Sequence, residues 1–252
     1  MTANDAILKP GAVALVTGAS SGIGAAVAAM LAARGARVVC AGRDPGRLEP
    51  VVSRLDGGRG VALRLDVTDA ESAATCLERL PEELRAVDIL VNGAGHDIGG
   101  RQRFDQGNVE DWAAIIEANV TGMIRVCHAV IPGMLARGLG HVINLGSVAG
   151  LRVGPQGSIY HASKYAVRAL TEGLRRDYAD TPLRVTEILP GLTRTGFARA
   201  RYGGDPVKGD AYYAGFPQTM EAEDVARCVL FAVEQPASVT VAQLVVVPTR
   251  EA

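Results

Sequence analysis

The sequence predicts a single α/β domain in which a parallel sheet of about seven strands is covered by helices on both faces. Two observations carry this prediction. Short apolar stretches of strand length alternate with longer stretches of helical character along the chain. The chain has 252 residues, of which 48% are hydrophobic, and this fits one α/β domain with a large core. Because we find no internal repeat and no interdomain linker, we expect one doubly wound domain over residues 1–252.

Most of the expected strands are short, continuous apolar runs, as is usual for parallel strands that are buried on both faces. The first strand runs into a glycine, and the last one is β-branched and ends at Pro248. In chain order, the expected strands are Val13–Thr17, Arg37–Ala41, Val61–Leu65, Ile89–Val91, His141–Leu145, Arg184–Leu189 and Val239–Val247.

The segments between these strands have helical character. The first is rich in alanine and stops at Gly35, and Asp44 followed by Pro45 has the order of an N-cap and a first helical residue. We expect Pro132 to kink or end the longest helix. The expected helices are Ile23–Arg34, Ala70–Leu80, Trp112–Ala136, Tyr160–Tyr178 and Glu223–Glu234.

The least regular part of the chain covers residues 190–221, which are rich in Gly, Arg, Tyr and Pro. Long irregular segments are uncommon in compact domains and are usually functional. We therefore expect a substrate loop or lid here.

Charge and cysteine usage narrow the class of protein. The chain has 26 Lys+Arg against 27 Asp+Glu, and this balance gives no electrostatic reason to expect a nucleic acid or an acidic membrane as partner. No run approaches the ~18 apolar residues of a membrane span, and the N-terminus lacks the apolar core of a signal peptide. The four cysteines show neither a CxxC pair nor metal-ligand spacing, so we expect free thiols, no metal and a cytoplasmic location.

A glycine cluster joins the first expected strand to the first expected helix, and residues 17–24 read TGASSGIG. Gly18 permits a sharp turn, Gly22 lets the backbone approach a pyrophosphate, and Gly24 allows close packing of helix on strand. The free N–H groups at the helix start, with the hydroxyls of Ser20 and Ser21, are suited to phosphate oxygens. A plain strand-to-helix turn also contains glycine, but the position on the first βα unit favours a dinucleotide site, in which Ile23 lies between the last two glycines.

The end of the second expected strand distinguishes NAD from NADP. An NAD site usually has an Asp or Glu there for the ribose 2′-hydroxyl, whereas this chain has Ala41, Gly42 and Arg43. A guanidinium suits a 2′-phosphate through charge-assisted, bidentate hydrogen bonds. The alternative explanation is that Arg43 is simply a solvated residue before a helix. The missing acid together with the added base favours NADP.

Small and polar residues follow the third and fourth strands, at the edge where open α/β sheets bind ligands. Asp66 and Val67 are placed to contact an adenine, although Asp66 is equally well explained as the cap of a turn. Asn92, Gly93 and Ala94 are small enough as a group to let a ribose lie against the backbone.

A second group of residues suits the reduction of a carbonyl. Tyr160 and Lys164 lie four apart at a helix start and therefore on one face. A phenol has a pKa of about 10, which a nearby ammonium lowers. Ser147 is placed to hold the substrate oxygen, and Asn119 to hold a water that links Lys164 to solvent. Taken alone, each residue also has a purely structural explanation. Tyr160 and Lys164 are explained as helix surface, Ser147 as part of a turn and Asn119 as a helix irregularity.

Together these motifs resemble the short-chain dehydrogenase/reductase family over essentially the whole chain. The motifs that carry the resemblance are TGASSGIG at 17–24, NGAG at 92–95, Asn119, Ser147, YHASK at 160–164, and Pro190-Gly191 followed by Thr193 and Thr195. Gly93, where the family usually has a second Asn, and Gly146, where many members have Ser, depart from the pattern.

The resemblance implies a Rossmann fold, an NADP cofactor and a homodimer or homotetramer. It also implies that Asn119, Ser147, Tyr160 and Lys164 are catalytic, with Tyr160 and Lys164 also contacting the cofactor. The stretch Pro190, Gly191, Thr193 and Thr195 is implied to contact the nicotinamide carboxamide.

The C-terminal third resembles one subgroup, which contains NADP-dependent 3-hydroxy acid (serine or allo-threonine) dehydrogenases and sulfoacetaldehyde reductases. Substrates of this subgroup are small and carry an anion near the reacting carbon. Arg201 is our candidate for binding that anion, while most neighbouring arginines are expected to be solvated. His96 lies in a stretch that is more polar than is common in the subgroup, and we expect it to wall the substrate pocket, because Tyr160 already serves as the acid.

The resulting hypothesis is reversible hydride transfer between NADP(H) and a small polar alcohol/carbonyl pair, such as a hydroxy acid or sulfoacetaldehyde. A reductase of a neutral or amine-bearing ketone or aldehyde is the first alternative. An epimerase or dehydratase is disfavoured by the chain length, and a non-catalytic NADP-binding regulator by the intact set of four residues.

Overall fold

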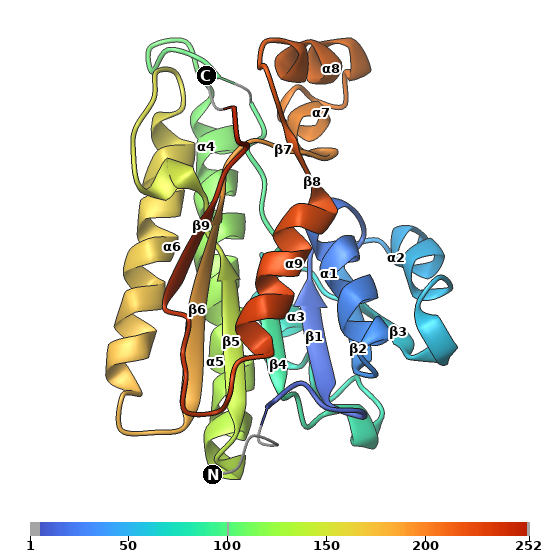
Figure 1. The fold of residues 1–252 in the computed structure, drawn as a ribbon. Coiled ribbons are helices and arrows are strands. Elements are labelled where there is room, and N and C mark those ends of the chain that lie inside the picture. Colours follow the sequence, from blue (N-terminus) through green and yellow to red (C-terminus); the bar gives the residue numbers. More distant parts are fainter. Residues whose placement is uncertain (1–5, 100, 251–252) are drawn as a thin grey trace.

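The computed structural model describes residues 6–99 and 101–250 and is built around a seven-stranded sheet (Figure 1). The strand order is β3-β2-β1-β4-β5-β6-β9, and every neighbouring pair is parallel. The order reverses between β1 and β4, which is where doubly wound sheets bind dinucleotides. The strands are β1 (Val13–Thr17), β2 (Arg37–Gly42), β3 (Gly60–Arg64), β4 (Ile89–Asn92), β5 (Gly140–Leu145), β6 (Leu183–Pro190) and β9 (Gln243–Val246).

Helices cover both faces of the sheet, as the sequence predicts. One core cluster joins the sheet to α1 (Gly22–Ala33), α2 (Pro45–Val52) and α9 (Ala222–Val233). A second cluster lies on the opposite face and joins it to α3 (Ala70–Ala74), α5 (Gly122–Arg137) and α6 (Ser158–Asp177). The helix α4 (Val109–Ile116) continues into α5 through a π-helical turn, Glu117–Thr121, and short 3-10 turns lie at Asp56–Gly58, Glu82–Leu84 and Val148–Gly150.

Two expected elements are shorter in the structure. Helix α3 ends at Ala74 rather than at Leu80, and the guanidinium of Arg79 donates instead to the carbonyls of Ser72 (2.5 Å) and Arg64 (2.8 Å). Strand β9 begins at Gln243 rather than at 239, because Arg184 holds the preceding loop through a hydrogen bond to the Val239 carbonyl (3.2 Å).

The helix does not end at Pro132, because α5 runs through it to Arg137, and its C-cap Gly138 has φ 63°. The irregularity lies upstream instead, in the π-helical turn. Among the described residues, one helix, Val109–Arg137, is long and apolar enough to cross a membrane by length and composition. Its α5 part contributes Met123, Val126 and other buried side chains to the core, as the core helix of a globular domain does.

The segment expected to be an irregular loop, residues 190–221, contains two short helices, α7 (Phe197–Arg201) and α8 (Pro206–Ala214). It is tied together by a small parallel pair, β7 (Thr193–Arg194) and β8 (Met220–Glu221). The two helices lie together beyond the carboxyl end of the sheet (Figure 1). The segment therefore forms a folded cover over the edge where ligands bind in this class of fold.

Candidate active site

A cavity of about 880 Å³ opens at the carboxyl edge of the sheet, between the β1–α1 loop and the 190–221 segment. It brings together every candidate site residue from the sequence except Asn92 and Asn119. Its lining includes Gly18, Ser20, Ser21, Gly22, Ile23, Gly24, Arg43, Asp66, Val67, Gly93, Ala94, His96, Ser147, Tyr160, Lys164, Pro190, Gly191, Thr193, Thr195 and Arg201.

The glycine loop is packed too tightly for side chains. Gly18 has φ 68°, and a Cβ there would lie 2.6 Å from the Gly93 carbonyl oxygen. A Cβ at Gly24 would overlap the Gly18 carbonyl oxygen, so the helix packs against the loop as expected. No side chain caps the N-terminus of α1 at Ser21, and this uncapped first turn lines the cavity through Ser21, Gly22 and Ile23. This cradle fits a pyrophosphate, because backbone donors and not side chains form it.

Two guanidiniums line the cavity near the end of β2. Arg43 is exposed and lines the wall together with Arg47, which was not among the residues predicted from the sequence. Burial raises the pKa of Asp66, but hydrogen bonds from Thr68 and the charges of Arg43 and Arg64 outweigh burial and lower this pKa overall. This end of the cavity therefore suits a negatively charged group between basic side chains, such as the phosphate of a phosphorylated ribose.

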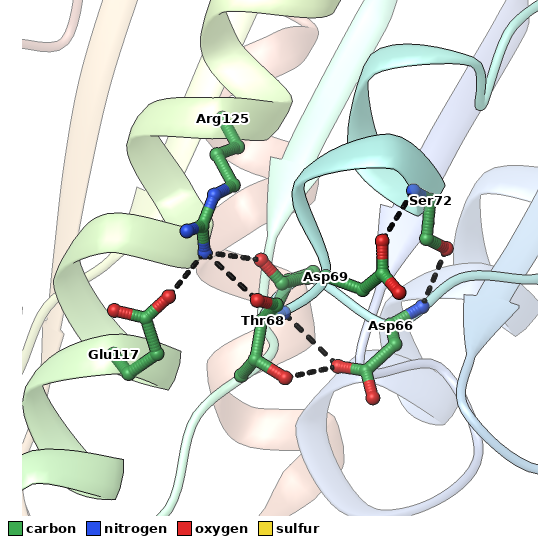
Figure 2. Close-up of polar contacts among 7 residues, drawn as sticks. Asp66, Thr68, Asp69, Ser72, Glu117 and Arg125 are labelled. Carbon is green, nitrogen blue, oxygen red and sulfur yellow. Dashed lines mark hydrogen bonds and ion pairs between the residues drawn. The ribbon is translucent and has the colours of Figure 1, made fainter.

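Asp66 serves as the cap of a turn and also lines the cavity, so its predicted capping role is confirmed. Its Oδ1 accepts hydrogen bonds from the N–H and the hydroxyl of Thr68, at 3.0 and 2.7 Å. Figure 2 shows how the turn is held: Ser72 accepts from the Asp66 N–H (3.1 Å), and Arg125 of α5 donates to the Thr68 carbonyl (3.1 Å) while pairing with Glu117. Arg125, which does not itself line the cavity, thus holds this cavity-lining turn through the Thr68 carbonyl.

The side chain of Asn92 does not line the cavity, while a cofactor contact of its backbone stays a prediction. Asn92 is buried, and its Nδ2 donates to Asn144 Oδ1 (2.9 Å) and Cys127 Sγ (3.2 Å) on the face of the sheet that α5 covers. Strand alternation turns this side chain away from the cavity. The backbone of the next residues does reach it, because Thr17 Oγ1 accepts from the N–H groups of Gly93 (3.1 Å) and Ala94 (3.2 Å).

Asn119 lies in the π-helical turn and does not line the cavity. It supports the cavity-lining loop after β4 through hydrogen bonds. Its Oδ1 accepts from the His96 N–H (2.8 Å), and its Nδ2 donates to the His96 carbonyl (3.0 Å) and to Ser163 Oγ (3.1 Å). A Cβ at Gly95 would lie 2.8 Å from Oδ1, so the loop after β4 is seated directly on this amide. The side chain reaches the neighbour of Lys164, while its expected link to Lys164 through a water stays a prediction.

Ser147, Tyr160 and Lys164 converge from β5 and the first turns of α6. Ser147 Oγ accepts a hydrogen bond from the Ala149 N–H (3.1 Å) and donates one to the Pro190 carbonyl (3.5 Å). Lys164 Nζ donates to the Leu145 carbonyl (2.9 Å) and lies 5.9 Å from the centre of the Tyr160 ring.

The pKa values of this group differ from the expectation. Burial raises the pKa of Tyr160 to about 12, although the hydrogen bond with Ser147 opposes the rise, and burial lowers the pKa of Lys164 to about 8. The expected lowering of the phenol pKa by Lys164 is outweighed by burial. Tyr160 is therefore a protonated phenol at neutral pH, ready to donate.

At the other end of the cavity, Arg201 of α7 is 4% exposed, and its Nε lies 2.7 Å from Asp97 Oδ2 in a buried ion pair. The guanidinium lies between the rings of Phe197 and Tyr212, at 5.3 and 4.7 Å from their centres. Its Nη1 has no hydrogen-bond partner among the described residues. A buried donor with no partner is costly, so this atom is a ready contact for an acceptor in the cavity.

Two residues that line this end of the cavity, Phe197 and Tyr212, were not predicted from the sequence, and neither was the ion pair of Asp97 with Arg201. The polar stretch that follows β4 is the signal that marks Asp97, but the pairing with Arg201 depends on how the 190–221 segment folds back. His96 lines the cavity, where burial and the charge of Arg43 lower its pKa, so it is a neutral wall.

Comparisons with known proteins agree with this site. Residues 12–204 match the family described as short chain dehydrogenase. Sulfoacetaldehyde reductase 2 of Chromohalobacter salexigens is 38% identical over 242 residues, which cover 95% of each chain. The NADP-dependent 3-hydroxy acid dehydrogenase of Schizosaccharomyces pombe is 34% identical over 241 residues, covering 94% of this chain and 92% of that one.

Solved structures give the same result. The closed form of a serine dehydrogenase complexed with NADP+ superimposes with a TM-score of 0.91 at 35% identity, covering 95% of this chain and 96% of that one. The seven-stranded parallel sheet, the glycine cradle and the relatives together place this chain in the short-chain dehydrogenase family.

Proposed function

We propose that this protein is an NADP(H)-dependent oxidoreductase that interconverts a small polar alcohol and its carbonyl compound. The observation that carries the proposal is one continuous cavity, which joins the glycine cradle and two arginines to Ser147, Tyr160 and Lys164. Bound NADP(H) supplies or accepts the hydride at such a site. The NADP-linked names of the relatives support this choice of cofactor.

The chain's own residues divide the work of binding. The N–H groups at the start of α1 bind the pyrophosphate, and Arg43 with Arg47 binds the 2′-phosphate. The turn at Asp66 and Val67 supports the adenine, and the stretch from Pro190 to Thr195 borders the nicotinamide end. Tyr213 holds that stretch in place, because its hydroxyl accepts from the Thr195 N–H at 3.2 Å.

The chemistry follows from the three polar side chains. In reduction, Tyr160 donates its phenolic proton to the substrate oxygen, and Ser147 holds that oxygen by a hydrogen bond. Lys164 stabilises the phenolate that remains on Tyr160. Oxidation of the alcohol uses the same groups in reverse, with Tyr160 accepting the proton.

The free Nη1 of Arg201 favours a substrate with an acidic group, such as a hydroxy acid or sulfoacetaldehyde. An amine-bearing carbonyl compound is the second candidate, because Asp97 places a carboxylate beside the guanidinium. A non-catalytic NADP-binding regulator is disfavoured, because Ser147, Tyr160 and Lys164 all line the cavity.

The test follows NADPH absorbance over a panel of hydroxy acids, sulfoacetaldehyde, amino alcohols and neutral ketones, each with NADP(H) and NAD(H). Tyr160→Phe should lower kcat by about 10²- to 10⁴-fold while NADPH binding is retained.

Arg201→Met should raise KM for acidic substrates by about 10- to 100-fold and leave the KM for neutral substrates nearly unchanged. Arg103→Met is the matched control, since Arg103 is exposed and pairs with Asp105 at 3.0 Å. Full turnover in Tyr160→Phe would refute the proposed mechanism.

We further propose a cytoplasmic homo-oligomer, either a dimer or a tetramer. All four cysteines are free, as suits a reducing compartment. Ile124 on α5 is 45% exposed, and Val245 on the edge strand β9 is 52% exposed. Such apolar side chains on the outer helix and the edge strand support burial between subunits.

A further inference from the structure

Glu187 stands in the middle of β6 and is 0% exposed, an unusual position for a carboxylate. Its Oε2 accepts a hydrogen bond from Gln243 Nε2 of β9 at 2.8 Å. Its Oε1 has no hydrogen-bond partner among the described residues. A half-satisfied buried carboxylate is costly unless a nearby cation compensates it.

The unpaired oxygen lies against the backbone that also holds Lys164. A Cβ at Gly146 would overlap Glu187 Oε1, so a glycine there makes room for the carboxylate. The preceding residue, Leu145, accepts the hydrogen bond from Lys164 Nζ at 2.9 Å. Leu145, the last residue of β5, thus holds the ammonium, and the next residue, Gly146, lies against the carboxylate. The carboxylate of Glu187 thus gives a physical reason why Gly146 stands where many family members have Ser.

Burial raises the pKa of Glu187. The hydrogen bond from Gln243 opposes this rise, as do the charges of three residues on one face of α6, Arg168, Lys164 and Arg175. Arg168 donates to the Gly150 carbonyl (3.4 Å), and Arg175 donates to the Ala242 carbonyl (3.3 Å). The groups packed from the β5 and β9 sides, Gly146 and Gln243, carry no charge. Of these three cations on α6, Lys164 is the one that lines the active-site cavity.

We propose that Glu187 is a positioning residue, the buried counter-ion that keeps Lys164 charged and seated against β5. Burial lowers the pKa of Lys164 to about 8, and the charge of Glu187 opposes this lowering. Without the carboxylate, desolvation acts unopposed and the ammonium loses its proton near neutral pH. The inference deepens the proposed function and rests on it, because a neutral Lys164 no longer stabilises the Tyr160 phenolate.

The test uses the ligand-free protein, which contains three lysines, at positions 9, 164 and 208. Labelling lysine with ¹³C at Cε gives three NMR signals whose shifts report protonation, and Lys164→Met assigns the signal of Lys164. In Glu187→Gln, the pKa of Lys164 should fall by about one unit or more. The pH above which kcat/KM for reduction declines should move down by the same amount.

The matched control is Glu172→Gln, a glutamate on α6 that pairs with exposed Arg176 and should leave the Lys164 signal unmoved. If Glu187→Gln does not fold, the reciprocal experiment decides, because coupling between two sites is mutual. With ¹³C-labelled glutamate, Lys164→Met should raise the pKa of Glu187 relative to the wild type.

An unchanged pKa of Lys164 in folded Glu187→Gln, or of Glu187 in Lys164→Met, overturns the proposal. The titration needs no substrate, so it stands or falls independently of whether turnover is found in the substrate panel.

Discussion

We propose that Arg43 contributes to the preference for NADP over NAD. It follows β2 directly, at the position where an NAD site usually has an acidic residue, and it lines the cavity together with Asp66. A guanidinium there attracts a 2′-phosphate, whereas NAD carries no such group. Arg47 shares the same wall, so we expect Arg43 to supply part of the preference and not all of it.

Arg43→Ala should therefore weaken NADPH binding by about 10- to 100-fold and leave NADH binding nearly unchanged. Dissociation constants from the quenching of protein fluorescence measure both. Arg54→Ala, at an exposed arginine just after α2 that does not line the cavity, serves as the control. Equal weakening of NADPH and NADH would show that Arg43 does not contact the 2′-phosphate.

Single residues also show how far local patterns reach. The turn at Gly18 and the close packing at Gly24 were predictable, because a glycine cluster between the first strand and the first helix is typical of a phosphate cradle. The roles of Asp97 and Glu187 were not, because each depends on a partner far away in the chain. Arg201 was predicted as an anion-binding residue, and the structure adds that Asp97 already neutralises part of its charge.

At the scale of elements, packing overrides local propensity in α5. A proline inside a helix costs about 3 kcal/mol. Val130, Ile131 and Met134 around Pro132 are all buried against the sheet, and full burial of such side chains contributes about 1.5–3 kcal/mol each. The helix therefore continues, although the sequence pattern indicates a break.

The contact between α5 and the turn at residues 66–69 is a second property of the elements. Arg125 reaches across from α5 to the carbonyl of Thr68 (3.1 Å), as Figure 2 shows, and it also donates to the carbonyl of Val67 (3.3 Å). A Cβ at Gly122 would lie 2.7 Å from Val67 Cγ2, so the turn also packs directly on the helix. Arg125 thereby orders a turn that lines the cofactor end of the cavity.

Arg125→Met should loosen this turn, since the methionine keeps the bulk and removes the donors. We expect NADPH binding to weaken about 3- to 10-fold, with kcat at saturating cofactor retained. Arg176→Met, at an exposed arginine on α6, is the control. Isothermal titration calorimetry measures the affinity, and an unaltered affinity would remove Arg125 from the account of the site.

At the scale of the whole molecule, the buried polar groups make stability depend on pH. His141 of β5 is 0% exposed, and its Nε2 lies 2.8 Å from Thr186 Oγ1 of β6. Burial, together with the charge of Arg184, lowers the pKa of His141 well below its usual range. In the unfolded chain this histidine titrates at about 6.5.

Below a pH of about 6.5 the unfolded state therefore binds a proton that the folded state does not. The free energy of unfolding should fall by about 1.4 kcal/mol per pH unit from this residue as the pH drops below that value, and reach its full value above it. Urea unfolding at fixed protein concentration between pH of about 7.5 and about 5 measures the slope. His141→Gln should flatten it, and His128→Gln, at an exposed histidine of α5, should not. Equal slopes in all three proteins would contradict the assignment.

The sequence by itself determined the fold class, the glycine cradle and the convergence of Ser147, Tyr160 and Lys164, because these follow from short-range spacing and from strand ends that share one edge. Only the tertiary structure decided that Asn92 turns into the core and that Asn119 braces the His96 backbone. Only the tertiary structure pairs Arg201 with Asp97 and sets Glu187 beside Gly146. Local patterns specify which atoms a segment offers, while burial and contacts between distant segments decide which partner each buried polar atom finds.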